Sequence, residues 1–448
     1  MLTILIVIWA ALLAVLLGIA LGRGRDGGAL TVSYFLGASL IHVPGALAFL
    51  APVPVIPHWG LGDRDATELG FEMTVIGMAA FVAGAILARV TDRRRSAAKS
   101  ALPQGQPQAR ALQRLGHRAL IAGAIVYFVL LPLASFLPSV TALASGLATL
   151  LILGLWLVTY GAVLDDDRQR LRLTLALLPL LPLATLVTGG FLAYGINWIV
   201  SVIAFLFVIS RQRILFYLAA PLVVYLGLSL FVTYMGQRTL IRELVWQQQS
   251  GIAERLDRVS KIATDFQFFD FSSATHVTAL DDRLNQNALV GRAMQRIDSG
   301  WVEFAFGATI PIWALIPRAV WPDKPDVGGG GTLVSDFTGI PFERSTSVGA
   351  GQVFEFYVNF GLAGVVGGFL LLGFVLMWLD RGIMRALDTS DTRALLLRAM
   401  PGLAMLQPGG NLLEVMVAIV GAIIVAYLTM HASIFRLLRR QRAKPQPA

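Results

Sequence analysis

The sequence predicts an all-α polytopic membrane protein, and three observations support that prediction. Of its 448 residues, 56% are hydrophobic and only 14% are charged, whereas an average globular chain has about 25% charged residues. Apolar runs of about 20 residues, long enough to cross a hydrocarbon core as a helix, recur along the chain. The net charge is +9, and most basic residues stand at the ends of apolar runs. That placement is typical of topology determinants rather than of a groove for nucleic acid.

Eleven apolar segments are predicted to span the membrane. They are residues 2–21, 31–51, 69–90, 119–137, 140–163, 173–189, 193–210, 214–235, 353–379, 395–409 and 411–431. The first lacks the basic start of a cleaved signal peptide and is too long for one. The segment 395–409 is short and contains two prolines, so a broken or re-entrant element is the alternative there.

Basic residues in the short connections predict the orientation, because such residues favour the cytoplasmic side. Four groups of them are Arg93, Arg94, Arg95, Lys99, Arg110, Arg114 and Arg118; Arg211 and Arg213; Arg381 and Arg385; and Arg436, Arg439, Arg440 and Arg442. With all four groups in the cytoplasm and eleven crossings, the N-terminus lies outside and the C-terminus lies inside.

The predicted organisation has four parts. They are an N-terminal bundle (1–235), a large extracytoplasmic loop domain (236–352), C-terminal helices (353–435) and a basic cytoplasmic tail (436–448). Residues 96–113 in the first part are predicted to form a disordered cytoplasmic linker. The apolar piece 301–320 contains prolines and an arginine, which favours a re-entrant or interfacial segment. A connection of over a hundred residues rarely lacks a role, so the functional site is expected in the loop domain.

Several kinds of chemistry have no support in the sequence. The chain has no cysteine and five scattered histidines, so a thiolate nucleophile is excluded and neither a metal ion nor another cofactor is expected. No phosphate-binding GxxxxGK[ST], dinucleotide-binding GxGxxG or serine-nucleophile motif is present. The tetraglycine Gly328–Gly331 is predicted to be a hinge or a tight loop.

The densest polar cluster is IPRAVWPDKPDVGGGG, residues 316–331. Arg318 offers a planar fork for a phosphate or diphosphate, and Lys324 adds a point charge. The alternative is that Arg318 reaches lipid headgroups and that Trp321 belongs to an interfacial aromatic belt.

A second cluster is GQVFEFYVNFGLAG, residues 351–364, at the mouth of a predicted span. It contains Glu355, Tyr357 and Asn359. A carboxylate near the bilayer boundary is expensive to hold and suits general-base work. The alternative is a helix-start carboxylate favoured by the helix dipole.

Weaker candidates lie elsewhere in the loop domain. Arg238 and Arg242 are four residues apart, so on a helix they share a face and can grip an anionic group. Arg344 is another cation of the same domain, and Glu303 and Asp336 are reserve carboxylates.

Taken together, these motifs resemble the bacterial oligosaccharide repeat-unit polymerases, the Wzy-type O-antigen and exopolysaccharide polymerases. The resemblance rests on IPRAVWPDKP, a glycine-containing loop, Ser345 and Ser347, and then EFYVNFGLAG leading into a span. It covers about 65 residues well, and the many-span layout with one long outer loop covers the rest loosely.

The resemblance implies a membrane glycosyltransferase of the bacterial inner membrane, with a helical architecture related to the GT-C class. Such an enzyme uses no metal and transfers a growing glycan from its polyprenyl diphosphate carrier to a new lipid-linked repeat unit, at the periplasmic face. Membrane lipids and a polysaccharide chain-length regulator are the partners it implies.

The chemistry of the residues is compatible with that reaction. Cations are needed for the departing diphosphate, and a base is needed for the acceptor hydroxyl. The expected catalytic residues are Arg318, Lys324 and Glu355. The expected substrate-binding residues are Arg238, Arg242, Glu303, Trp321, Asp336, Arg344, Tyr357 and Asn359.

Three alternatives remain. An O-antigen ligase shares the topology and the donor but uses a different acceptor. A lipid-linked glycan flippase or other transporter predicts related halves and polar central spans, which the sequence does not favour. A membrane scaffold without catalytic activity is the third.

Overall fold

The computed structural model describes most of the chain as helices. The described residues are 1–20, 27–57, 61–96, 106–130, 138–189, 192–210, 213–246, 264–307, 309, 321, 330–342 and 348–431. Within them there is no β-strand, and the helices are α1 (Leu2–Ala20), α2 (Ala29–Ala48), α3 (Arg64–Ser96), α4 (Gln106–Ile125), the π-helix η1 (Val126–Leu130), α6 (Pro138–Leu164), α7 (Arg168–Leu177), α8 (Leu180–Gly189), α9 (Leu192–Ile209), α10 (Ile214–Trp246), α12 (Ala274–Leu284), α13 (Gln286–Asp298), α14 (Gly330–Thr338), α15 (Gln352–Thr389), α16 (Thr392–Ala404) and α17 (Leu412–His431).

Nine helical segments in the described part of the chain are long and apolar enough to cross a membrane. The protein is therefore an all-helical, multi-pass membrane protein, as the sequence predicts. Two of the eleven predicted spans are not among the nine. The segment 119–137 is divided between α4, η1 and residues outside the described part. The segment 395–409 contains the end of the 13-residue helix α16, which begins at Thr392, and then irregular chain.

Helix α4 overlaps the segment 96–113 that the sequence predicts to be a disordered linker. Because the helix starts at Gln106, residues 106–113 are helical rather than disordered. Leu112 and Ala119 are buried, and glycines allow α4 to lie close against α6, as Gly123 does against the backbone of Leu151. This packing supplies the stability that the polar composition of the segment does not.

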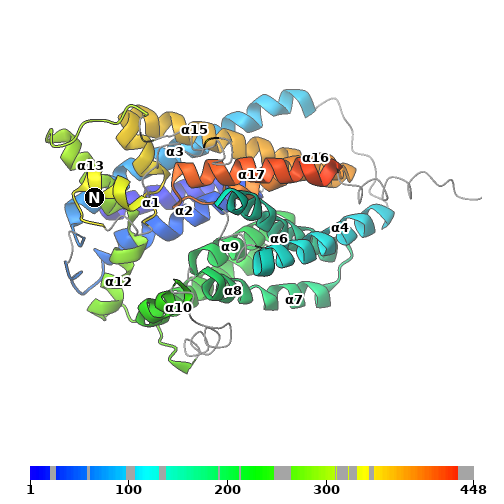
Figure 1. Ribbon diagram of the computed structural model, residues 1–448, viewed down its shortest axis with the longest axis horizontal. Coiled ribbons are helices and arrows are strands. Elements are labelled where there is room, and N and C mark those ends of the chain that lie inside the picture. Colours follow the sequence, from blue (N-terminus) through cyan, green and yellow to red (C-terminus); the bar gives the residue numbers. More distant parts are fainter. Residues whose placement is uncertain are drawn as a thin grey trace, which may run out of the picture.

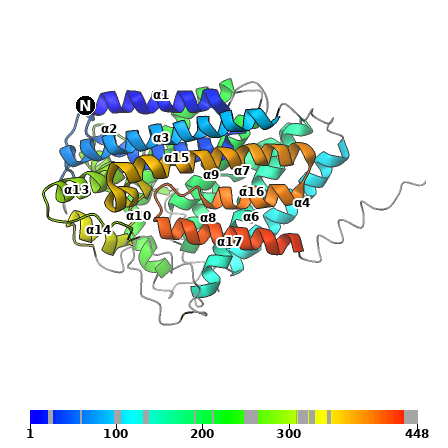
Figure 2. The ribbon, with the colours of Figure 1, turned by 90° about the horizontal axis from the view of Figure 1, so that it is seen from above.

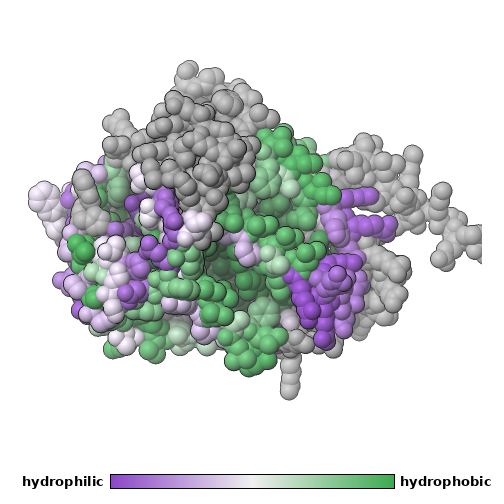
Figure 3. Space-filling view, turned by 90° about the horizontal axis from the view of Figure 1, so that it is seen from below, coloured by the Kyte–Doolittle hydropathy of each residue, from purple (hydrophilic) through white to green (hydrophobic). Residues whose placement is uncertain are grey.

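The helices form two groups that contact each other through α2 against α9, through α16 against α6, and through α17. Helices α1, α2, α3, α15 and α16 make the first group, and α4 and α6 to α9 make the second, with α17 packed on both α6 and α16 (Figure 1). Seen from above, α1, α3 and α15 run side by side along the molecule (Figure 2). A broad apolar band separates hydrophilic surfaces at the two ends (Figure 3), as expected for a body that sits in a bilayer.

The centre of the first group is the parallel pair of α3 and α15. A Cβ atom on Gly84 would lie 2.0 Å from the carbonyl oxygen of Leu370, and one on Gly373 would lie 2.0 Å from that of Phe81. The two backbones therefore touch where only glycine leaves room, the small-residue packing that membrane helices use.

We expect Gly373→Ala to destabilise the protein by about 2 kcal/mol, because the new methyl group meets backbone that cannot move aside. The matched control is Gly367→Ala on the same helix, where a Cβ meets no atom within 4 Å. That variant should be neutral or slightly stabilising, since alanine favours helix. Thermal unfolding of the two purified variants in the same detergent checks this, and equal shifts would contradict the packing.

Buried charges fix one end of the first group, which we call the basic end because α3 and α15 finish there among arginines. The Arg381 guanidinium lies 3.2 Å from Asp92 and donates to the carbonyl oxygen of Arg89 at 2.7 Å. Arg89 in turn donates to the carbonyl oxygen of Ile19 at the end of α1. Asp380 accepts hydrogen bonds from the first residues of α2, so four helices are tied together here.

Helices α12 and α13 close the opposite end, which we call the α13 end. Asn287 at the start of α13 accepts from Thr74 at 3.1 Å, contacts the Nδ1 atom of His42 at 2.7 Å and donates to the carbonyl oxygen of His42. A Cβ on Gly291 would lie 1.8 Å from the carbonyl oxygen of Ala66. Helix α13 is therefore built into the bundle. The N-terminal amine of Met1 also lies at this end, 3.1 Å from Glu68.

Candidate functional site

A break in the helical backbone marks the candidate site. Helix α16 starts at the basic end and stops at Ala404, and α17 starts at Leu412 beside the first turn of α15. Between them, residues 405–411 lack helical structure but are mostly buried or half-buried. The predicted span 395–409 is thus a short helix followed by irregular chain. Backbone of this kind is tolerated inside a membrane protein only where other groups satisfy its polar atoms.

Two glutamines satisfy this irregular backbone. Gln352, at the start of α15, donates to the carbonyl oxygen of Gln407 at 2.9 Å and accepts a hydrogen bond from the Tyr34 hydroxyl. Gln286, at the start of α13, donates to the carbonyl oxygens of Gly349 at 2.8 Å and Gly409 at 3.3 Å. Helices α13 and α15 are therefore bonded directly to the irregular chain, and α2 is connected to it through Gln352.

Close backbone contacts complete this centre. A Cβ on Gly349 would lie 2.4 Å from the carbonyl oxygen of Gly409, and one on Gly330 would lie 2.0 Å from that of Val348. Two residues of the tetraglycine, Gly330 and Gly331, begin α14 and are buried. In this part of the tetraglycine, the requirement for glycine comes from close packing.

Glu355 lies at this junction and is only 2% exposed. Its Oε1 atom accepts the backbone N–H of Leu412 at 2.6 Å, so the carboxylate caps α17 rather than its own helix. Among the residues the structure describes, this is the only donor within hydrogen-bond distance of the carboxylate. Its other oxygen, Oε2, is left to accept a proton.

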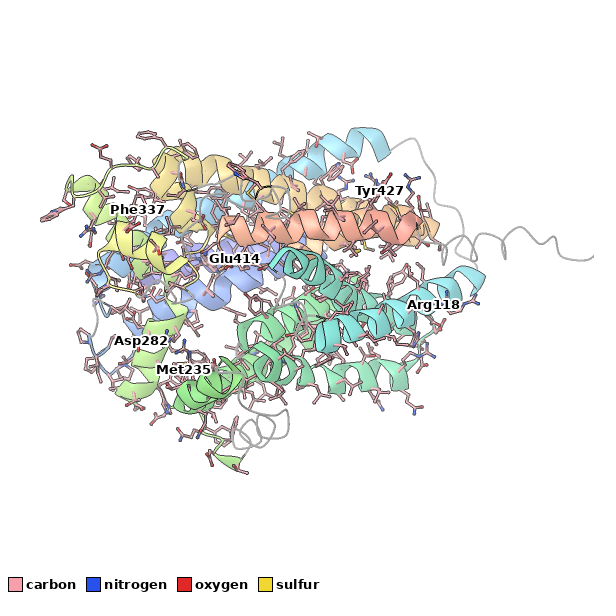
Figure 4. The ribbon with its side chains drawn as sticks, in the orientation of Figure 1. Arg118, Met235, Asp282, Phe337, Glu414 and Tyr427 are labelled. Carbon is pink, nitrogen blue, oxygen red and sulfur yellow. The ribbon has the colours of Figure 1, made fainter. Side chains whose placement is uncertain are left out.

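A second carboxylate, Glu414, lies in the first turn of α17 itself. Its charge acts on both Glu355 and Tyr194. Its side chain is exposed. Figure 4 shows Glu414 at the start of α17, between that helix and the second helix group. Glu355 thus caps the first turn of α17, and Glu414 lies within that turn.

Asn359 holds the preceding loop against α15. Its Oδ1 atom accepts the backbone N–H of Gly307 at 2.9 Å, and its Nδ2 atom donates to Thr309 at 2.7 Å and to the carbonyl oxygen of Glu355 at 2.8 Å. The residue is fully buried. Its amide is occupied by protein contacts, which fits a positioning role better than the substrate contact predicted from the sequence.

The cations predicted from the sequence cannot be placed directly. Arg318, Lys324 and Arg344 lie outside the described residues. The ends of the stretch 310–329, however, are fixed. Thr309 accepts a hydrogen bond from Asn359. Gly330 lies against Asn411, and the next residue, Leu412, donates its N–H to Glu355.

The other predicted site residues occupy varied positions. Tyr357 is buried, and its ring lies 5.9 Å from that of Phe304. Trp321 is 41% exposed, and Glu303 and Asp336 are exposed, without a described contact to Glu355. Arg238 is half-buried on α10, and Arg242 is on the same helix with its side chain outside the described part.

The sequence analysis does not identify Gln286, Gln352 or Tyr34 as residues of the site. A signal was present, because QPGGN at residues 407–411 interrupts an apolar region with groups that break helices. Their partners are up to several hundred residues away in the chain, so their role emerges only from the fold.

No family model matches the chain, and searches of curated proteins and of solved structures found no match. Within the described part of the chain, no group of three or more histidine, aspartate or glutamate side chains is placed to hold a metal ion.

Proposed function

We propose that the protein is a membrane glycosyltransferase that polymerises oligosaccharide repeat units carried on a polyprenyl diphosphate. The α13 end would face the periplasm and the basic end the cytoplasm of a bacterial inner membrane. The arginines of the basic end favour this orientation.

The observation that carries the proposal is the position of Glu355. A buried carboxylate with one free oxygen stands at the end of the bundle where the stretch 310–329 leaves and returns. That stretch contains two cations and two tryptophans between prolines. A base and a diphosphate-binding group are what this transfer requires at one place.

In the proposed reaction Glu355 accepts the proton of the acceptor hydroxyl group through Oε2. The hydroxyl oxygen then forms a bond to the anomeric carbon of the donor glycan. The bond from that carbon to the diphosphate oxygen breaks, and its electron pair leaves with the polyprenyl diphosphate. Arg318 and Lys324 stabilise the charge on this leaving group.

The direct test is chain extension by the purified protein in lipid nanodiscs, with polyprenyl-diphosphate-linked repeat units as donor and acceptor. We expect a ladder of products that differ by one repeat unit. Arg318→Ala and Lys324→Ala should each lower the rate by about 10²-fold, because each removes charge stabilisation of the leaving group. Asp391→Ala, at the basic end, serves as the control.

Two outcomes would contradict the proposal. Unchanged rates in Arg318→Ala and Lys324→Ala would show that these cations do not stabilise the leaving group. A single transfer to a lipid A core acceptor, without a ladder of products, would favour a ligase.

A transporter of lipid-linked glycans is the second candidate, and the irregular chain at 405–411 favours it. Transporters place broken helices of this kind at their substrate sites. The same nanodisc preparation separates the two, since a transporter leaves the repeat units unjoined.

A further inference from the structure

The loop formed by residues 301–307 presents two aromatic side chains at the surface. Trp301 is 77% exposed and Phe306 is 76% exposed. Phe306 has a φ angle of +44°, in the left-handed region that bulky residues rarely adopt. A conformation that costs free energy and exposes an apolar ring suggests that the ring has a use outside the protein.

The loop is held rigidly in this conformation. Ala305 donates its backbone N–H to the carbonyl oxygen of Val358 at 2.8 Å, and Gly307 donates to Asn359 at 2.9 Å. The Val358 carbonyl is available because α15 is kinked at Phe360 and Gly361. The kink therefore frees the acceptor that anchors the loop.

The kink also lies about one hydrocarbon thickness along α15 from Arg381. From Gly361 to Arg381, at the basic end, α15 runs 20 residues. At 1.5 Å per residue these cover about 30 Å, the thickness of a hydrocarbon core. The helix between them exposes apolar side chains, among them Leu362 at 51%, Leu371 at 62% and Trp378 at 51%.

The loop continues this lipid-facing surface. Phe360 is 48% exposed at the kink, and a Cβ on Gly307 would lie 3.4 Å from the edge of its ring. Phe304 packs between Phe306 and Tyr357, with ring centroids 6.0 and 5.9 Å away. The Arg296 guanidinium lies 5.9 Å from the centroid of Trp301. Aromatic rings paired with a cation are typical of the headgroup region of a bilayer.

We propose that the 301–307 loop is a membrane anchor whose Trp301 and Phe306 rings insert into the lipid leaflet at the α13 end, at the boundary of headgroups and acyl chains. The inference goes beyond the proposed function and stands without it. It has a consequence for that function, because the loop leads directly into the stretch 310–329. An anchored loop holds the start of that stretch at the level of lipid phosphates.

The absence of cysteine from the chain allows a direct test. A nitroxide label on Phe306→Cys, in protein reconstituted into bilayers, is compared with labels on Leu371→Cys in the apolar face and Asp298→Cys at the exposed end of α13. Collisions with oxygen, which enters the bilayer, and with a polar nickel complex, which does not, report the depth of each label.

We expect the label at 306 to collide more with oxygen than with the nickel complex, between the two references and closer to 371. Trp301→Cys gives a second reading that does not involve the strained residue. Labels at 301 and 306 that both match the water-exposed reference at 298 would overturn the proposal and favour aromatic surfaces for a soluble ligand, such as a glycan.

Discussion

Glu355→Gln is expected to lower the rate of repeat-unit extension by about 10²-fold or more without unfolding the protein. Base assistance contributes typically about 10²–10⁴-fold in such reactions, and an amide cannot take the proton. Glutamine has the same shape and keeps an oxygen to accept the Leu412 N–H, so the cap on α17 remains.

Rates measured in nanodiscs at saturating substrate check this prediction. Glu72→Gln is the control, since it changes an exposed carboxylate near the same end of the bundle. Thermal unfolding should give closely similar midpoints for Glu355→Gln and the unchanged protein. A fully active Glu355→Gln protein would show that this carboxylate is only a helix cap.

Asp380→Ala should give the largest loss of stability, about 3 kcal/mol or more. The Asp380 carboxylate is 2% exposed and accepts hydrogen bonds from Leu30 N at 2.8 Å, Thr31 N at 2.9 Å and Thr31 Oγ1 at 2.7 Å. It therefore supplies the cap that α2 lacks in its own sequence, where Gly28 precedes the helix. Removing it leaves several buried donors without a partner, each of which costs free energy.

The comparison is with Asp391→Ala, which removes the N-cap that α16 has in its own sequence. Asp391 is exposed and accepts from Arg393 N and Ala394 N, both at 3.1 Å. Loss of an exposed N-cap costs about 1 kcal/mol. The midpoint of thermal unfolding in detergent should fall further for Asp380→Ala, and a similar fall in both variants would mean that the buried contacts add nothing.

The sequence was sufficient for features that depend on local pattern. Apolar length predicts the membrane helices, and the prolines of 395–409 indicate the alternative that the structure shows there, a short helix followed by irregular chain. The sequence also identifies Glu355 as a carboxylate at a span boundary. The sequence pattern does not indicate which group Glu355 contacts. Its hydrogen-bond donor, the N–H of Leu412 at the start of α17, comes 57 residues later in the chain.

Contacts between distant segments explain the remaining differences. Nothing near Asp380 in the sequence points to α2, which lies 350 residues earlier. Asn359 is predicted from the sequence to bind substrate, and only the fold shows that Gly307 and Thr309 occupy its side-chain amide. The contacts at Gly84 and Gly373 depend on the relative register of two helices, which a single sequence does not encode locally.

The central claim is that the cations of the stretch 310–329 meet the Glu355 carboxylate at the α13 end. The most direct measurement is cross-linking of Arg318→Cys with Glu414→Cys in membranes by a short thiol reagent, since Glu414 is exposed beside Glu355. We predict a cross-link for this pair and none for Arg318→Cys with Asp391→Cys at the basic end. Failure of the first pair to cross-link, with both cysteines reactive, would contradict the account.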